Sequence, residues 1–550
     1  MTHMKNKLLT LFVIFVGLIS FNWHSPLVQA ATTIQNPSKV LVVYDSLNER
    51  NYRQEDVQTL SRMLMSMGQQ VTMMAMSDYH AGMISKGHYQ AVITMINWPG
   101  MKFDNPAFDR DRHQFNGKKL HIGPLMTVDE KQNFPGNWQE INQQSFVLKG
   151  QNNRYEQQVD FQRQIQLLDK VTGNEQALSQ LVAANGTNQT YPFGIINGQD
   201  AYLPFFSSQG ATLLSSIQLI AQWLGVHGNY VPYVDVRDFT PLSSFTATKE
   251  FIKNLDSFEG NMIITTTSTT QNTDTKTFKN YLKFLREMTR NNRAVVYLNV
   301  PALNGVDNSN DDTLMNMLTQ EISTLIENKI FPLGVSAPTY WNFDKYYQLN
   351  ALNFGDATLL YNQINNQDYH TQTSTAKAYQ TMFFAIPHSA LKNIKWNING
   401  RYTDFTFPMP VTVDYHFPNS KAKAEKINRE IKALPFAPMS QYLYQFNTGI
   451  STQTQNLRGG KDGVISLNGT PVSEIDFHQI KQQTAGIRQN RDQTGHLTTK
   501  GIVDKISNVL IVIIVVTLIV LFGMLAIGRK LYLRMFKNRN LKRTKGAKKK

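Results

Sequence analysis

Residues 39–45 read KVLVVYD, an unbroken apolar run that stops at an acidic residue. An apolar run without polar alternation is typical of a strand buried on both faces, as in parallel sheets. Apolar residues then recur at helical spacing between 57 and 67, and Gly68 is a typical helix end. Three further runs predict strands: residues 70–76, 89–96 and 119–122. This alternation predicts a flavodoxin-like, three-layer α/β domain over residues 31–228.

Ligands of such sheets bind at the carboxyl ends of the strands. Five side chains are expected there: Asp45, Ser46, Asn48, Asn97 and Trp98. The turn after the first strand lacks a glycine that would bring backbone N–H groups close to a phosphate. Flavin and nucleotide binding are therefore not expected, and no cofactor is predicted. The chain also has no Cys, which excludes an amidotransferase nucleophile, so a structural or carbohydrate-contacting domain is expected.

Residues 229–450 repeat a strand-then-helix order that is typical of a β/α barrel. The first strand lies within NYVPYVDVRDFTP, residues 229–241, and carries Asp235 and Asp238. Later strands of the barrel are predicted at residues 261–265, 294–300 and 358–361. Beyond residue 375 the pattern changes to strands at residues 381–386, 393–398 and 411–415. These strands predict an accessory β-layer beside the barrel.

Three motifs make this segment similar to the polysaccharide deacetylases, in their divergent bacterial membrane-associated branch. Residues 236–241 (VRDFTP) resemble the family's motif at the end of the first strand. Residues 299–304 (NVPALN) follow an apolar strand where the family has a His-x-x-x-His metal motif. Residues 332–338 (PLGVSAP) match a Pro-x-Gly-x-x-x-Pro segment. The resemblance covers residues 230–362 and implies a distorted β/α barrel of the carbohydrate esterase kind.

The departures from the family pattern predict a degenerate site. Deacetylation in the family needs a divalent metal held by two His and an Asp, with a carboxylate as base. Asp238 matches the metal carboxylate, but Arg237 stands at the base, and Asn299 and Leu303 replace the His pair. No metal and no confident catalytic residue are therefore predicted, and Asp235, Arg237 and Asp238 are expected to be relics. Candidate glycan-binding residues are Asp238, Asn299, Tyr340 and Trp341.

Histidines elsewhere could still be recruited to this site. None occurs between His227 and His370, but His370, His388 and His416 lie further along the chain. Isolated His residues are more often ordinary core or surface groups, so none of them is assigned a role.

The charge of the chain is concentrated at one end. The formal net charge is +15, but residues 529–550 hold 11 Lys or Arg and no acid. Without this tail, and without Lys5 and Lys7, the remainder is close to neutral. A nucleic-acid partner is therefore not expected. The tail is expected to contact anionic membrane lipid.

Both ends of the chain suggest export and anchoring. Residues 1–30 resemble a signal peptide, and residues 451–508 are polar enough for a stalk. Residues 509–528 form an uncharged run of 20 residues, long enough for a transmembrane helix. The basic residues 529–550 then predict a cytoplasmic tail and an extracellular body. The lack of Cys in an exported body suggests a bacterial envelope, of the Gram-positive kind.

The order of these parts resembles proteins encoded with exopolysaccharide synthases, such as those making Pel-type amino-sugar polymers. It implies a role in cell-surface exopolysaccharide synthesis, export or modification, by binding the polysaccharide or its synthase complex without catalysis. Two alternatives stay open: an active deacetylase of N-acetyl amino sugars, and an adhesin or signalling ectodomain. The absent His pair separates the first alternative from the binding role.

Overall fold

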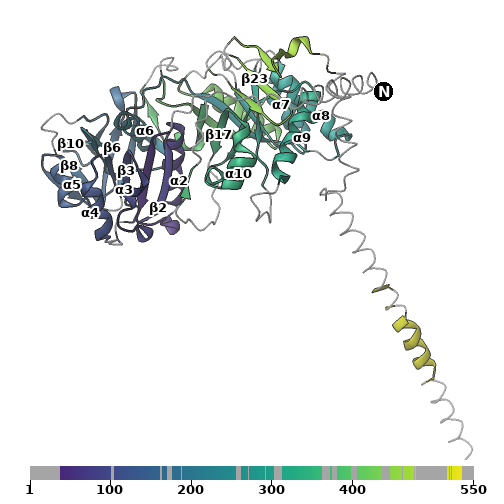
Figure 1. Ribbon diagram of the computed structural model, residues 1–550, viewed down its shortest axis with the longest axis horizontal. Coiled ribbons are helices and arrows are strands. Elements are labelled where there is room, and N and C mark those ends of the chain that lie inside the picture. The colour runs from purple at the N-terminus through teal and green to yellow at the C-terminus, as the bar shows by residue number, and fades with distance from the viewer. Residues whose placement is uncertain are drawn as a thin grey trace, which may run out of the picture. The chain divides into compact units, whose positions relative to one another are not determined.

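The apolar runs of the N-terminal segment form the centre of a seven-stranded sheet (Figure 1). Its five parallel strands lie in the order β12 (Asp200–Leu203), β4 (Lys118–Ile122), β3 (Ala91–Met95), β1 (Lys39–Tyr44) and β2 (Gln70–Ala75). Antiparallel strands form the two edges: β11 (Ile195–Asn197) and β18 (Gln372–Thr373). The strand order reverses at β1, which creates a switch point between β1 and β3.

The described residues of this half form the α-helices α2 (Gln54–Ser66), α3 (Met83–Gly87), α4 (Pro106–Gln114), α5 (Val128–Gln132) and α6 (Gly210–Leu224). A second, antiparallel sheet contains β10 (Thr190–Pro192), β9 (Gln180–Ala183), β6 (Gln144–Lys149), β7 (Tyr155–Phe161) and β20 (Lys395–Trp396). A further pair consists of β5 (Trp138–Ile141) and β8 (Ile165–Leu168). Apart from β20, the strands of these two antiparallel sheets all lie between β4 and β11 in the chain.

The second half is a closed barrel of seven parallel strands. In barrel order these are β13 (Tyr233–Phe239), β14 (Met262–Thr266), β15 (Ala294–Asn299), β16 (Pro332–Pro338), β17 (Ala357–Tyr361), β19 (Thr381–Pro387) and β21 (Val411–His416). β21 pairs with β13 and closes the barrel. Its helices are α7 (Phe245–Lys253), α8 (Lys276–Thr289), α9 (Thr313–Glu327), α10 (Lys345–Asn350) and α11 (Lys421–Lys432). The α/β class expected from the sequence is confirmed.

The predicted accessory β-layer is corrected by the closure of the barrel. β19 and β21 are the sixth and seventh barrel strands, and both are almost fully buried. Only β20 leaves the barrel, and it pairs with β7 of the antiparallel sheet. The sequence misled because, among the described residues between β17 and β19, no helix marks the next β/α unit.

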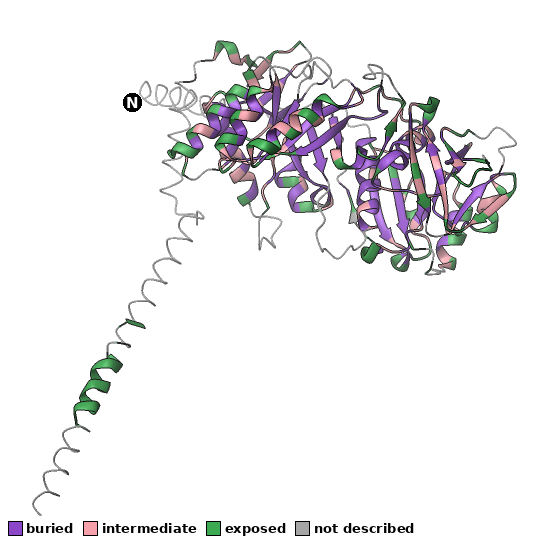
Figure 2. Ribbon diagram, turned by 180° about the vertical axis from the view of Figure 1, so that it is seen from behind, coloured by how far each residue is buried: buried purple, intermediate pink, exposed green. Residues whose placement is uncertain are grey.

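Helix α2 connects the sheet and the barrel. Twelve of its 13 residues are buried, although many of them are polar. Arg62 reaches into the barrel wall, where its Nη1 donates to the carbonyl oxygens of Ala385 (2.8 Å) and Leu360 (3.4 Å). The ladder between β17 and β19 ends beside these two residues, so the guanidinium satisfies carbonyl groups there. Figure 2 shows buried residues running through both halves.

A small antiparallel sheet follows the barrel, formed by β22 (Thr448–Ser451), β23 (Asn456–Gly459), β24 (Ile465–Leu467) and β25 (Thr470–Pro471). β22 contacts barrel strand β16. The structure therefore differs from the predicted polar stalk, because the first part of residues 451–508 is folded against the barrel. Ile450 and Leu457 are buried there, and they provide the apolar contacts that the polar composition obscured. One compact unit ends at Ile475, and a second covers Asp476–Lys550.

The computed structural model describes residues 37–477 and parts of 517–534. Within these limits the positions outside the description are 52, 99, 101–104, 162–163, 170–175, 188, 256–261, 270–271, 291–292, 303–311, 362–371, 375–380, 398–404, 437–445, 447, 461, 476, 478–516, 519–520 and 522. The predicted signal peptide, most of the predicted stalk and residues 535–550 of the tail also lie outside the described residues.

The predicted C-terminal transmembrane helix is not found, which corrects the expected fold class. No helix within the described part of the chain is both long and apolar enough to cross a membrane. The described helical stretch 523–534 has 12 residues and contains Arg529, Lys530 and Arg534. Eleven positions of the predicted span, within 509–522, lie outside the described residues.

Candidate binding site at the barrel mouth

Strands β13 and β21 bring five polar side chains to the carboxyl end of the barrel. The parallel register places Asp235 beside Asp414 and Arg237 beside His416, and Asp238 follows on β13. The carboxyl end is where β/α barrels build their functional sites, because the strand ends and the following loops converge there. The predicted residues Asp235, Arg237 and Asp238 therefore meet two residues from a strand that lies almost 180 positions later.

Asp235 and Asp414 form a buried pair of carboxyl groups. Burial raises the pKa of Asp235 well above its ordinary value, and the neighbouring Asp414 charge raises it further. Burial also raises the pKa of Asp414, although the charge of Arg237 opposes this. The raised pKa favours the protonated form of Asp235, whose carboxyl accepts a hydrogen bond from Thr265 Oγ1 (2.9 Å). Asp235 is fully buried and therefore lies in the barrel interior, behind the exposed part of the site.

Arg237 lies at the centre of the network. Its Nε is 3.0 Å from Asp414 Oδ1, and its guanidinium carbon lies 4.5 Å from the centre of the Tyr361 ring. Its Nη2 donates to His416 Nε2 over 3.0 Å. A guanidinium can only donate, so His416 Nε2 accepts and its proton lies on Nδ1. That Nδ1 donates to Asp238 Oδ2 over 2.6 Å.

Asp238 is held in a strained conformation at the surface of the mouth. Its φ of 70° lies in the left-handed region, and the pairing of β13 with β14 is irregular between Val236 and Phe239. Non-glycine residues in this region cluster at functional sites, at a cost on the order of 1 kcal/mol. Burial raises the pKa of Asp238, but the His416 hydrogen bond and the Arg237 charge outweigh it and lower the pKa. Asp238 is thus an exposed carboxylate with 49% of its side chain accessible.

The opposite side of the mouth contains the residues at the expected metal motif. Asn299 accepts from the Tyr361 hydroxyl (3.1 Å) and donates to Thr267 Oγ1 (3.3 Å). Val300 is buried, and Leu303 lies outside the described residues. Among the described residues, no group of three or more His, Asp and Glu side chains could hold a metal ion. The arrangement is instead a chain of hydrogen-bonding groups around the mouth.

The remaining predicted glycan-binding residues lie in the turn after β16. Trp341 is buried and stacks on Tyr347, with ring centres 4.1 Å apart. A stacking role for Trp341 would require this ring to be uncovered first. Tyr340 belongs to the same turn, Thr339–Asn342, and its side chain lies outside the description.

Three residues of the mouth were missed from the sequence: Asp414, His416 and Tyr361. His416 was considered only as one of several downstream histidines. The signal that could have found it is the run VTVDYH, residues 411–416, in which a buried strand ends on a histidine. Placing that strand in the barrel would have brought its last residues to the mouth. His388 instead stacks on Tyr415, and His370 lies outside the described residues.

The carboxyl edge of the first sheet differs from the mouth. Asp45 accepts from three backbone N–H groups, those of Ser46 (2.8 Å), Asn97 (2.6 Å) and Trp98 (2.8 Å). It therefore ties the ends of β1 and β3 together. A cavity of about 420 Å³ lies at this edge, and Asn48, Asn97 and Phe205 contribute to its lining.

Comparisons with known proteins do not show a family for this chain. No family model matches it, and no curated protein matches it. A crystal structure of a ThuA-like protein from Parabacteroides merdae matches 32% of this chain and 81% of its own length. The identity is 14% and the TM-score is 0.20, so this likeness carries no argument about function.

Proposed function

We propose that the protein binds a polysaccharide at the mouth of its barrel and takes part in exopolysaccharide synthesis, export or modification without catalysing it. The strongest support is the exposed Asp238–His416 pair, in which His416 also accepts a hydrogen bond from Arg237. A carboxylate, an imidazole and a guanidinium in fixed positions offer both acceptors and donors to sugar hydroxyl groups. The left-handed φ of Asp238 also supports a functional role, because strained residues cluster at functional sites.

The electrostatics of the site also support binding. Arg237 has its charge balanced by Asp414, and it contacts the face of Tyr361. It is therefore fixed before any ligand arrives, and little side-chain entropy is lost on binding. Asp235 lies beside Asp414 in the barrel interior, and its raised pKa favours the protonated form, which repels the Asp414 carboxylate less than a second charge would.

The test measures glycan binding to the full chain by calorimetry, with N-acetylglucosamine oligomers and oligogalacturonate as probes. Asp238→Asn and His416→Gln should each weaken binding at least tenfold, about 1.4 kcal/mol. Asp78→Asn, which removes one exposed carboxylate from the sheet half of the molecule, is the matched control and should change affinity less than twofold. Full affinity in both mouth variants would overturn the proposal.

A second function, hydrolysis or deacetylation, is favoured by one specific contact. The 2.6 Å hydrogen bond between His416 and Asp238 is the arrangement in which a carboxylate orients an imidazole for proton transfer. Arg237 opposes this role, because it occupies His416 Nε2, the nitrogen that would take the proton. Acetate release from acetylated amino-sugar oligomers, lost in Asp238→Asn, would favour this function over simple binding.

A further inference from the structure

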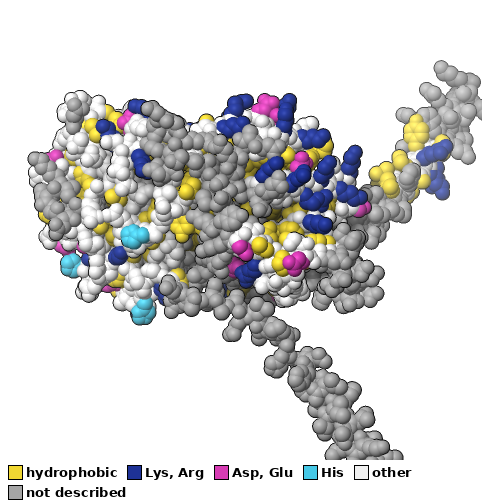
Figure 3. All heavy atoms as spheres, turned by 90° about the horizontal axis from the view of Figure 1, so that it is seen from above, with side chains coloured by type: hydrophobic (Ala, Val, Ile, Leu, Met, Phe, Trp, Pro, Cys, Tyr) yellow, Lys and Arg dark blue, Asp and Glu magenta, His cyan; other side chains and the backbone are white. Residues whose placement is uncertain are grey.

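The outer face of the barrel carries a concentration of positive charge. Helices α11, α7 and α8 follow strands β21, β13 and β14, which are neighbours in the barrel, so these helices cover one continuous sector. Together they hold eleven Lys or Arg and four Glu, a formal net charge of +7. We call this sector the basic face. Figure 3 shows Lys and Arg side chains gathered at the barrel end of the molecule.

Positively and negatively charged side chains are unevenly exposed on the basic face. All eleven cationic residues are exposed: Lys249, Lys253, Lys276, Lys279, Lys283, Arg286, Lys421, Lys423, Lys426, Arg429 and Lys432. Of the four Glu, only Glu287 is exposed. Glu250 and Glu425 both lie near Lys421, at 3.7 and 3.8 Å. Because surfaces normally mix both signs, this excess of exposed positive charge indicates a surface that meets an anionic partner.

The neighbouring helix shows that the charge is not a general property of the barrel. Helix α9 follows α8 around the barrel, contains no Lys or Arg, and carries Glu321 and Glu327. The basic face therefore has an edge at α8. The basic face extends from the mouth to the opposite end of the barrel. Helices α7 and α11 begin beside the mouth, after Asp238 and His416, and α8 ends near the amino ends of β15 and β16.

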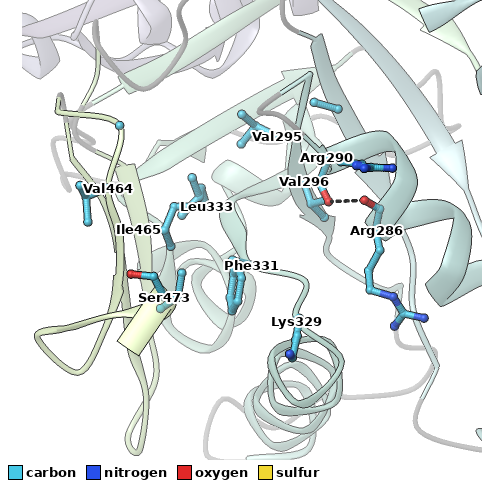
Figure 4. Close-up of a pocket in the computed structure, with 14 residues that line it drawn as sticks. Arg286, Arg290, Val295, Val296, Lys329, Phe331, Leu333, Val464, Ile465 and Ser473 are labelled. Carbon is cyan, nitrogen blue, oxygen red and sulfur yellow. Dashed lines mark hydrogen bonds between the residues drawn. The ribbon is translucent and has the colours of Figure 1, made fainter. Parts of the chain in front are cut away.

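A cavity of about 540 Å³ lies at that far end of α8 (Figure 4). Arg286 from α8, Arg290 directly after α8 and Lys329 after α9 lie on one side of it, and Val464, Ile465 and Ser473 lie on the other. Phe331 and Leu333 lie between the two sides. Cationic side chains next to an apolar floor fit a sugar ring that carries a carboxylate, because the ring's C–H face packs on apolar groups while the carboxylate binds the guanidinium.

We propose that the basic face and this cavity bind an acidic polysaccharide, one whose repeating unit contains a uronic acid. The inference rests on the proposed glycan-binding function and names its substrate class. A flexible polyanion can follow α8, roughly 21 Å long, from the mouth to the cavity. A flat bilayer can contact only part of three helices that curve around a barrel. A deacetylated amino-sugar polymer is cationic, so this face repels it.

The experiment measures binding of the full chain to polygalacturonate, with dextran as the neutral polymer and phosphatidylglycerol vesicles as the anionic bilayer. Polygalacturonate should bind, and raising the salt from 50 to 300 mM should weaken binding at least tenfold, because screening shortens the reach of these charges. Two variants test the surface: a triple Lys421→Gln, Lys423→Gln, Lys426→Gln, and a double Arg286→Gln, Arg290→Gln. Each should lower the affinity about tenfold.

The matched control replaces three exposed lysines outside the basic face, Lys39, Lys86 and Lys345, with Gln. It should change affinity less than twofold. An equal loss in the control, or binding to vesicles but not to polygalacturonate, would overturn the proposal. Loss of binding in Asp238→Asn alone, with the surface variants unaffected, would overturn it as well but leave the proposed function standing. Loss of binding in the surface variants alone, with full binding in Asp238→Asn, would support an acidic polymer on the basic face. It would contradict the proposed binding role of the mouth.

Discussion

The sheet and the barrel each place an aspartate at the carboxyl end of a central parallel strand, and the two carboxylates are used differently. Asp45 at the end of β1 is 4% exposed and accepts only from backbone N–H groups. Asp238 at the end of β13 is half exposed and accepts from a side chain of another strand. Burial raises the pKa of Asp45, whereas the partners of Asp238 lower its pKa below the ordinary value.

The difference shows how to separate structural from functional acids at strand ends. A carboxylate surrounded by backbone donors has its hydrogen-bonding capacity used by the fold, so it stabilises a turn and has little to offer a ligand. A carboxylate held by His and Arg side chains in a strained turn costs the fold some stability and keeps an exposed oxygen for other groups. Each of the following variants tests one side of this contrast.

Asp45→Ala should have the largest effect on stability. It leaves three backbone N–H groups at the ends of β1 and β3 without their acceptor, which should lower the free energy of unfolding by about 3 kcal/mol. Asp45→Asn keeps one carbonyl acceptor and should lose less. Urea unfolding followed by circular dichroism measures both. A loss below about 1 kcal/mol in Asp45→Ala would mean that Asp45 is not structural.

Asp238→Gly compared with Asp238→Ala isolates the strain at the mouth. Both variants lose the same carboxylate, but only glycine adopts a φ of 70° without steric cost. The Gly variant should therefore be more stable than the Ala variant by about 1 kcal/mol, in the same unfolding assay. Equal stabilities would mean that the turn relaxes, and the functional interpretation of its strain would fail.

Asp235→Asn should have the smallest effect, because it replaces a neutral carboxyl by a neutral amide. The amide can still donate to Asp414 and accept from Thr265, so the change at pH 5 should stay within about 1 kcal/mol. In the parent, the raised pKa of Asp235 means that the folded state holds a proton which the unfolded state releases above its ordinary pKa. The contribution of Asp235 to the parent's stability therefore falls as the pH rises from 4, and the variant should lose that part of the slope.

Thermal unfolding of parent and Asp235→Asn between pH 4 and pH 8 measures the slope. Asp414→Asn serves as the comparison, because it removes the partner of Arg237 and should destabilise at every pH in this range. If Asp235→Asn destabilises more at pH 8 than at pH 4, then Asp235 is the charged member of the pair and its assignment here is wrong.

Much of the mouth was predictable, because Asp235, Arg237 and Asp238 stand in one strand with a recognisable motif. Their neighbours were not. Asp414 and His416 come from β21, which the sequence placed in an accessory layer, and Tyr361 ends β17. Contacts between residues nearly 180 positions apart depend on how the barrel closes, and neither hydrophobic periodicity nor a local motif contains that information.

Local patterning was enough for the strands and for the α/β class, since an apolar run such as 39–44 must be buried wherever it lies. It could not show that α2, with its Gln, Asp and Arg residues, is buried between two domains, because its own pattern is that of a half-exposed helix. It could not show that the pKa of Asp235 is raised, because a pKa depends on the neighbours and solvent of the folded chain. Burial of apolar runs is a local free-energy requirement, whereas pairing and protonation depend on which distant segments meet.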